Sequence, residues 1–195
     1  MNKSDIYNKD KETEEIIEHP MGDDDIKFYL PDAKIIKYSE LSKYNNIDEL
    51  LPKNIDYVFI LYEDSPNKGH WTTTTKHKTG KGKPTISYFD SYGGKIDNPL
   101  NWMPKEENKK LKQDKKLLSN LLKKCPYKVE YNPIKYQGEN KNEDINSCGR
   151  HATFYVKNLT DCNRDLDQYY KLMSSIKKES GNTYDEIVSH LIDKI

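Results

Sequence analysis

The feature that most constrains the fold is one continuous apolar run, residues 56–63 (DYVFILYE), in an otherwise strongly polar chain. The run has the length of a strand and is rich in aromatic and β-branched residues, so it predicts a buried central strand. Residues 70–78 (HWTTTTKHK) and 84–90 (PTISYFD) predict two more strands, joined by a turn at 79–83 (TGKGK). Antiparallel pairing of these two strands would decide which of their side chains face one another.

Helical patterns surround these strands. Residues 104–124 carry leucines on one face and lysines elsewhere, with a proline at the start and another just beyond the end, which predicts one amphipathic helix. Residues 128–131 predict a short strand, and further helices are predicted to open at Cys148, to span residues 165–178 and to follow the capping-box pattern at 183–186. The expected fold class is therefore α+β, with a small central mixed sheet flanked by helices.

Composition limits the remaining possibilities. The chain has 195 residues, and 32 Lys and Arg balance 32 Asp and Glu, which argues against an overall polybasic nucleic-acid binder. Residues 1–20 are charged and are expected to form a mobile arm, with residues 21–195 as a single domain. No apolar run approaches the ~20 residues that a membrane span needs. The first residues also lack the hydrophobic stretch of a signal peptide.

Four residues carry the chemistry that the sequence suggests. They are His70 in Gly-His-Trp, Asp90 in Tyr-Phe-Asp-Ser-Tyr-Gly, Gln137 in Lys-Tyr-Gln and Cys148 in Asn-Ser-Cys-Gly-Arg-His. A thiol, an imidazole, a carboxylate and an amide are the parts of a cysteine hydrolase. The thiolate attacks, the imidazole moves the proton, the carboxylate orients the imidazole and the amide donates to the oxyanion.

The predicted elements explain how these residues could meet. With a hairpin turn near residues 80–82, His70 lies opposite residues 90–94, so Asp90 could bond its ring and fix the tautomer. Cys148 is expected at a helix N-terminus, capped by Asn146 or Ser147, where free backbone N–H groups favour the thiolate. The Cys148 amide and Gln137 would hold the oxyanion, and Gly149, as a substrate-binding residue, would let the backbone approach the substrate closely.

Other residues compete for these roles. His151, three residues after Cys148, is the alternative base, whereas His19 and His77 are expected to be solvated. Cys125 and Cys162 are interpreted as ordinary small apolar residues. The three cysteines are sparse and include no CxxC pair, which indicates neither a disulfide framework nor a zinc site. No metal or other cofactor is expected, and a reducing compartment fits best.

The lysine-rich stretch within residues 105–124 leaves a choice open. It holds eight lysines and three acids. The simpler interpretation is the wet face of a helix. The alternative is contact with DNA or an acidic partner.

At these motifs the chain resembles the adenovirus-type and SUMO-protease-type cysteine proteases. Within that group it is most similar to the maturation proteases of virophages and related large DNA viruses. The resemblance covers roughly residues 21–160. It is carried by the segments at 21–30 (MGDDDIKFYL), 59–63 (FILYE), 69–71 (GHW), 88–93 (YFDSYG), 136–137 (YQ) and 147–151 (SCGRH).

The resemblance implies a papain-like, adenain-like fold with the chain order His70, Asp90, Gln137, Cys148. It implies cleavage next to small residues, typically Gly, in capsid precursor proteins, with Trp71 forming the wall of a narrow substrate groove. It further implies a monomer in the virion and in the virus factory of the infected cell, neither secreted nor membrane-bound. Adenovirus-type enzymes can also use DNA or a peptide as an activator.

Two rival functions remain. An isopeptidase that removes ubiquitin-like modifiers would use the same site residues on a different substrate. A non-catalytic interaction module would keep the fold without the chemistry. Reaction of Cys148 with a thiol-directed electrophile separates the second rival from either enzyme.

Overall fold

The computed structural model describes residues 13–78, 82–138 and 145–193. Their centre is a five-stranded mixed sheet with the strand order β1-β2-β3-β4-β5. The two outer pairs, β1 with β2 and β4 with β5, are parallel, and the two inner pairs are antiparallel. The strands are β1 Lys34–Lys37, β2 Asp56–Ser65, β3 Lys68–His77, β4 Thr85–Asp90 and β5 Lys128–Tyr131.

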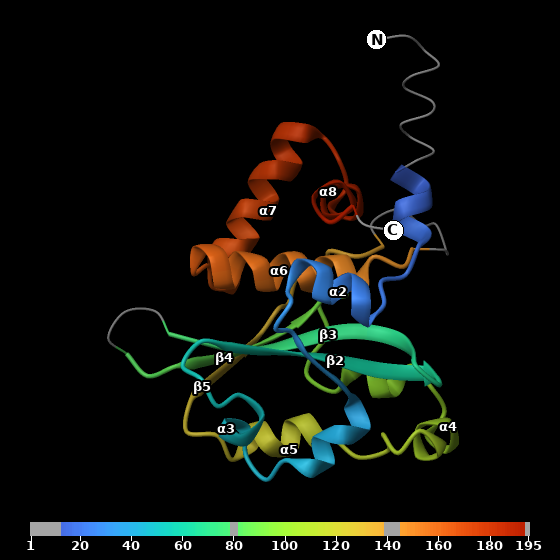
Figure 1. Ribbon diagram of the computed structural model, residues 1–195, viewed down its shortest axis with the longest axis vertical. Helices are drawn as coiled ribbons and strands as arrows, with labels where there is room; N and C mark the ends of the chain where they lie inside the picture. The colour runs from blue at the N-terminus through green and yellow to red at the C-terminus, as the bar shows by residue number, and fades with distance from the viewer. Residues whose placement is uncertain (1–12, 79–81, 139–144, 194–195) are drawn as a thin grey trace.

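Helices cover both faces of this sheet (Figure 1). The upper layer in Figure 1 consists of α2 Asp23–Tyr29, α6 Cys148–Cys162, α7 Leu166–Ser180 and α8 Tyr184–Leu191. Below the sheet lie η1 Tyr38–Lys43, α3 Ile47–Leu50, α4 Lys105–Lys110 and α5 Leu117–Lys123, while η2 spans Asn98–Asn101. Residues 13–18 are also helical. None of the described helices is long and apolar enough to cross a lipid bilayer.

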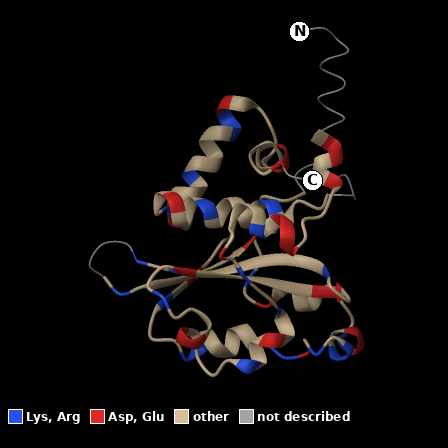
Figure 2. Ribbon diagram, viewed as in Figure 1, with Lys and Arg blue, Asp and Glu red and all other residues tan. Residues whose placement is uncertain are grey.

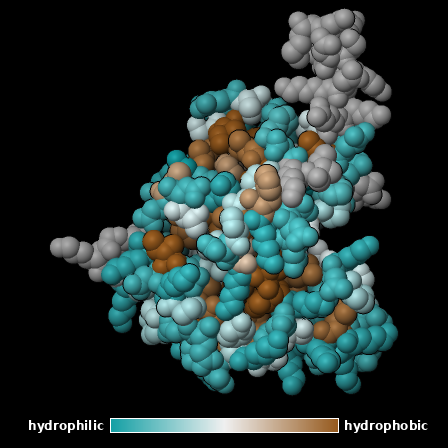
Figure 3. All heavy atoms as spheres, in the orientation of Figure 1, coloured by the Kyte–Doolittle hydropathy of each residue, from teal (hydrophilic) through white to brown (hydrophobic). Residues whose placement is uncertain are grey.

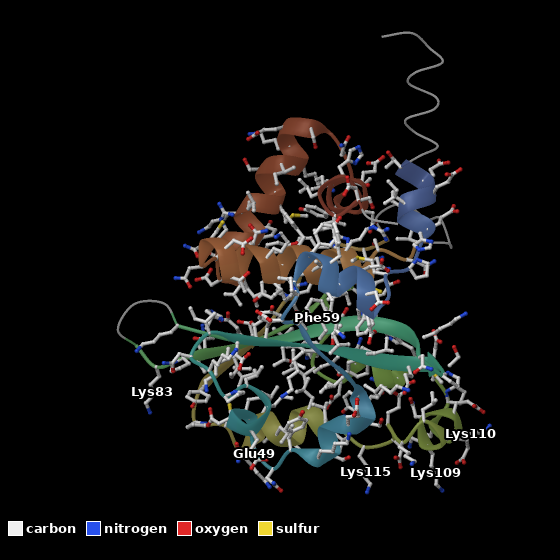
Figure 4. The ribbon with its side chains drawn as sticks, viewed as in Figure 1. Glu49, Phe59, Lys83, Lys109, Lys110 and Lys115 are labelled. Carbon is white, nitrogen blue, oxygen red and sulfur yellow. The ribbon has the colours of Figure 1, made fainter. Side chains whose placement is uncertain are left out.

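Strand β2 is buried on both of its faces, because its side chains alternate between two hydrophobic cores. Phe59 and Leu61 belong to the core under α6, and Val58 and Ile60 belong to the core over α5. Figure 4 labels Phe59 between the sheet and the upper helices. This double burial explains why residues 56–63 form a continuous apolar run and not an alternating one.

Charged residues concentrate on the helices and loops around the sheet (Figure 2). All eight lysines between residues 105 and 124 are exposed, and Lys109, Lys110 and Lys115 extend outward from the lower layer (Figure 4). The space-filling view shows brown hydrophobic patches separated by teal polar side chains (Figure 3). The lysines of this segment are therefore exposed to solvent, which both interpretations of the segment require.

The predicted α+β class is confirmed, with a small mixed sheet flanked by helices. The strands predicted at residues 56–63, 70–78, 84–90 and 128–131 are all present. The helices predicted at 165–178 and after the capping box are present too, and Thr183 accepts from the backbone N–H of Glu186 as that pattern indicates. The hairpin turn lies mostly outside the described residues, as does most of the loop after Gln137.

The single helix predicted for residues 104–124 is wrong, because the chain forms α4 and α5 with a break between them. Lys112 has a positive φ of 57°, and the next residue, Gln113, is buried. The Gln113 amide bonds with the backbone N–H and carbonyl of Glu63 and donates to Asn108 Oδ1. These tertiary bonds to β2 outweigh the local preference for one continuous helix.

Two smaller expectations also fail. His77 is buried, not solvated, with 2% of its surface exposed. Ser147 is the N-cap residue of α6, but its side chain makes no capping bond, and its hydroxyl donates to Asp185 instead. The Asn146 amide donates to the carbonyl of Glu18.

Candidate active site

His70 and Asp90 meet on one face of the β3–β4 pair. Asp90 is directly opposite Thr72. His70 lies two residues before Thr72 on the same face of β3, so it is the diagonal neighbour of Asp90. His70 Nε2 lies 2.9 Å from Asp90 Oδ1, and the carboxylate also accepts from the backbone N–H of Tyr92. Because an ionised carboxylate only accepts, Nε2 carries the proton, which leaves Nδ1 for a further partner.

That partner is Cys148, the first residue of α6. Burial alone would lower the pKa of His70, but its bonds to Asp90 and Cys148 and their negative charges raise that pKa to about 9. Burial would likewise raise the pKa of the Cys148 thiol, but His70 and the backbone N–H groups of Trp71 and Gly149 lower it below its ordinary value. Both shifts favour a thiolate–imidazolium pair.

Gln137 approaches the same site from the loop after β5. It is buried, and its side-chain Oε1 accepts from Ser91 Oγ at 2.7 Å, which fixes the orientation of the amide. Its Nε2 donates to the carbonyl of Ile145 at 3.0 Å, three residues before Cys148. One Nε2–H remains without a partner among the described residues.

The Trp71 ring is 5% exposed, packs edge-on against Phe59 and donates its indole N–H to the carbonyl of Met21. Trp71 also lines a surface pocket together with Leu61 and Asn67. Its expected role as the wall of a substrate groove stays a prediction. The contribution of Trp71 to the site is its backbone N–H, which bonds the thiol.

Gly149 has a packing reason to be glycine. A Cβ at this position would lie 2.8 Å from the Cβ of Met21 and 3.3 Å from the Trp71 ring. The close approach that Gly149 permits is therefore with residue 21 of the same chain. Its predicted contact with a substrate stays a prediction.

Two exposed aromatic residues beside His70 were missed by the sequence analysis. Tyr92 and Trp102 are 38% and 47% exposed, and their ring centroids lie 5.1 and 4.9 Å from that of His70. Trp102 belongs to the loop just after η2, which no local pattern connects with β3. The signal available in the sequence was only an unassigned tryptophan in a polar stretch.

His151, the alternative base, is occupied elsewhere. It is fully buried, and its Nε2 lies 3.1 Å from Asp185 Oδ1. Asp185 in α8 also accepts from Ser147 Oγ and from the backbone N–H of Gly138. Sequence reasoning missed Asp185 because it lies beyond the motifs and looks like an ordinary first-turn acid of a helix.

The segment before α2 lies along the start of α6. The hydrogen bonds are Asn146 N to Ile17 O (3.0 Å), Asn146 Nδ2 to Glu18 O (2.8 Å), Arg150 Nη1 to His19 O (2.5 Å) and Trp71 Nε1 to Met21 O (2.9 Å). The donors come from β3, from α6 and from Asn146 just before α6. The described part of the predicted arm is thus bonded to the elements that hold the site.

No group of His, Cys, Asp and Glu within the described residues has the arrangement of a metal site. Cys125 is half-buried and Cys162 is exposed, so neither is the buried apolar residue that was expected.

Comparison with known proteins gave a relative in Sputnik virophage. Its "Uncharacterized protein V9" is 33% identical over 157 residues, which cover 80% of this chain and 84% of that protein. It comes from a virophage, the group of viruses to which the sequence motifs pointed. No protein-family model matches the chain.

Among solved structures, the chain is similar to the crystal structure of the ASFV pS273R protease. The TM-score is 0.45 and the sequence identity 17%, over 78% of this chain and 62% of the protease chain. The chain thus spans less than two thirds of that protein. At this level of similarity, the match by itself says nothing about the activity of this chain.

Proposed function

The chain belongs to the family of the Sputnik virophage protein V9, and we propose that it is a cysteine endopeptidase that processes capsid precursor proteins. The observation that carries the proposal is the hydrogen-bonded series Asp90–His70–Cys148. A buried carboxylate, an imidazole of raised pKa and a thiol of lowered pKa are the requirements for nucleophilic catalysis by cysteine.

The proposed reaction begins with the Cys148 thiolate attacking the carbonyl carbon of the scissile peptide. A sulfur–carbon bond forms, and the carbonyl π electrons move to oxygen. The proposed oxyanion donors are two N–H groups. One is the backbone N–H of Cys148, which belongs to the first turn of a helix and so has no intrahelical partner. The other is the Nε2–H of Gln137 that has no partner among the described residues.

The oxyanion then re-forms the carbonyl, the C–N bond breaks, and the imidazolium of His70 protonates the leaving amine. Water, deprotonated by the neutral imidazole, next attacks the thioester carbonyl carbon. The sulfur–carbon bond finally breaks, which releases the acyl group as a carboxylic acid and restores the thiolate.

Cleavage next to small residues such as Gly, and action during virion maturation, are parts of the proposal that rest on the motif resemblance. The virophage relative supports a viral setting for them. Under this proposal the protein acts in the virus factory and in the virion, with capsid precursors as its partners. Activation by DNA or a peptide would be tested as an addition to the same assay.

The test is co-expression with a candidate capsid precursor, followed by mass spectrometry of the products. Wild type and Cys162→Ala, which changes an exposed thiol away from the site, are expected to give the same new terminus beside a small residue. Cys148→Ala is expected to give none. Cleavage of a modifier conjugate but of no capsid precursor would favour the isopeptidase. An inert Cys148 thiol would favour the interaction module.

A further inference from the structure

Asp185 is a buried carboxylate on which three hydrogen bonds converge. Oδ1 accepts from Ser147 Oγ at 2.5 Å and lies 3.1 Å from His151 Nε2, while Oδ2 accepts from the backbone N–H of Gly138 at 2.9 Å. Ser147 and His151 are fully buried and Asp185 is 2% exposed. The donors come from α6 and from the loop after β5, whereas Asp185 belongs to α8, seen end-on above α6 in Figure 1.

The charge on Asp185 is held in place by these donors. Burial alone would raise the pKa of the carboxyl, but the bonds from His151, Ser147 and Gly138 outweigh burial and lower it. The cluster is not a second Ser-His-Asp active site. The carboxylate lies between the hydroxyl and the imidazole, so His151 has no contact through which it could take the proton of Ser147.

The sequence positions of two of these donors connect the cluster with the candidate active site. Gly138 directly follows Gln137, and Ser147 directly precedes Cys148. Gln137 and Cys148 carry the proposed oxyanion donors, and they flank residues 138–147 of the chain. Gly138 has a φ of 74°, in the left-handed region, so the peptide that Asp185 bonds is part of a turn just beyond Gln137. One carboxylate thus bonds the residue adjoining each donor.

We propose that Asp185 is a positioning residue that sets the separation between the Gln137 amide and the Cys148 backbone N–H, and so shapes the oxyanion hole. It touches no reacting atom. The inference rests on the proposed cysteine peptidase function. It extends the site to α8, which lies beyond the motifs at which the protease resemblance was drawn.

Two thiol reactions separate this role from a general structural one. A peptide aldehyde is attacked at its carbonyl carbon, so a sulfur–carbon bond forms and the carbonyl π electrons move to oxygen, which the oxyanion donors stabilise before it takes a proton from His70. Iodoacetamide is attacked at its CH₂ carbon, and iodide leaves with the bonding electrons. The second reaction needs the thiolate but creates no oxyanion.

The experiment uses the full chain and the probe N-acetyl-Leu-Ala-Gly-glycinal, with Asp185→Asn as the variant. The asparagine side chain has an acceptor oxygen and a donor NH₂ group, whereas its three partners here are all donors. Where the NH₂ group faces one of these donors, a hydrogen bond is lost and the contact becomes repulsive. We expect aldehyde affinity to fall about 10- to 100-fold, less than the ~10²–10³-fold that loss of an oxyanion donor costs. The rate of Cys148 alkylation should stay close to wild type. Asp193→Asn, the same change at an exposed residue, should alter neither measurement.

Unchanged aldehyde affinity in Asp185→Asn would overturn the inference, and so would a parallel loss of aldehyde affinity and alkylation rate. If Asp185→Asn does not fold, Ser147→Ala decides, because it removes one donor and leaves the carboxylate bonded to His151 and Gly138. Affinity is then expected to fall without a change in alkylation, and an unchanged affinity contradicts the role.

The proposed function fails separately from the inference. Wild-type protein in which Cys148 alkylates no faster than the exposed Cys162, and which binds no aldehyde, would contradict the peptidase itself. Rapid alkylation of Cys148 without aldehyde binding would mean that no oxyanion hole is formed. That result would overturn both the oxyanion assignment and the role of Asp185.

Discussion

Every neighbour of the Cys148 sulfur that the structure describes as bonding it favours the negative charge. The His70 ring contributes a hydrogen bond and a positive charge, and two backbone N–H groups add further bonds. Asp90 stabilises the charged imidazole from its other side. Because thiolate and imidazolium stabilise each other, their titrations are coupled, and pH should change both together.

We therefore expect iodoacetamide to alkylate Cys148 rapidly well below pH ~8.5, the ordinary thiol pKa. Peptide cleavage should decline as pH rises through about 9, where His70 loses the proton that the leaving amine requires. Peptide mass mapping between acidic and alkaline pH follows Cys148, with the exposed Cys162 as reference. In His70→Gln, the pH profile of Cys148 alkylation should shift to higher pH and coincide with the profile of Cys162. Coincident profiles in wild type would contradict the ion pair.

The two tryptophans near His70 should respond differently to removal. Trp71→Ala deletes a core ring and should cost about 3–5 kcal/mol in the free energy of unfolding. Trp102→Ala removes a ring that is 47% exposed, so stability should stay nearly unchanged while kcat/KM falls several-fold through a higher KM. Denaturant unfolding and steady-state kinetics measure the two effects. Normal kinetics in Trp102→Ala would exclude that ring from substrate binding.

Residue types and their order predicted which side chains could meet at this site. His70 and Asp90 were predictable because a hairpin relates their positions through strand register. Trp102 and Asp185 were not, since each reaches the site through a loop or helix whose docking depends on the whole core. The burial of Trp71 was not predictable for the same reason, because its indole N–H bonds the carbonyl of Met21, 50 positions earlier in the chain.

At the scale of elements, the segment before α2 and the start of α6 are packed at the closest approach that glycine allows. The Cβ of Met21 occupies the space where a Cβ of residue 149 would be. The carbonyls of residues 17–21 complete this contact by accepting from side chains and backbone next to Cys148.

Gly149→Ala should therefore destabilise the protein by about 1–3 kcal/mol, the usual cost of overpacking. The close contact is between two Cβ atoms, so Met21→Gly should relieve it, whereas Met21→Ala, which keeps its Cβ, should not. A double-mutant cycle by urea unfolding measures the difference. Additive losses for Gly149→Ala combined with Met21→Gly would show that this contact does not exist.

Strands and capped helices were predicted well because their signals are local. The apolar run of β2, the threonines of β3 and the capping box of α8 each need only neighbouring residues. The break between α4 and α5 was not predictable, because the buried Gln113 bonds to β2, 50 positions earlier in the chain. Helical periodicity continues through the break.

At the scale of the whole molecule, the sheet separates two cores, and the buried histidines make stability depend on pH. Burial lowers the pKa of His77 below its ordinary 6.5. The folded state then binds this proton less readily than the unfolded chain, so its stabilisation is full above pH 6.5 and is lost as pH falls. His70 acts in the opposite direction, and its contribution is lost between pH 6.5 and about 9.

His77→Leu should consequently flatten the acid side of the stability curve. As pH is lowered from 7 to 5, the urea midpoint of unfolding is expected to fall in wild type and to fall less in the variant. His190→Leu, a change at an exposed histidine, is the control and should follow wild type. An acid limb of the same slope in His77→Leu would assign the pH dependence to other groups.

The general architecture was predictable from the balance of apolar and polar segments, but the two-sided burial of the sheet was only implied. The apolar run at 56–63 indicated a strand covered on both faces, yet nothing indicated that both parallel connections, β1 to β2 and β4 to β5, would pass on the face opposite α6. Packing of that layer depends on aromatic and leucine contacts distributed along the chain.

The Arg150–His19 hydrogen bond joins residues 131 positions apart, and the Asp185–Gly138 bond spans 47. A ribosome releases the chain in order, so the hairpin with His70 and Asp90 emerges well before the helix with the thiol and the helix with Asp185. Closing such long loops needs most of the chain. A nascent copy therefore holds an incomplete site, and under the proposed function it could not cleave neighbouring chains on the polysome until synthesis has passed α8.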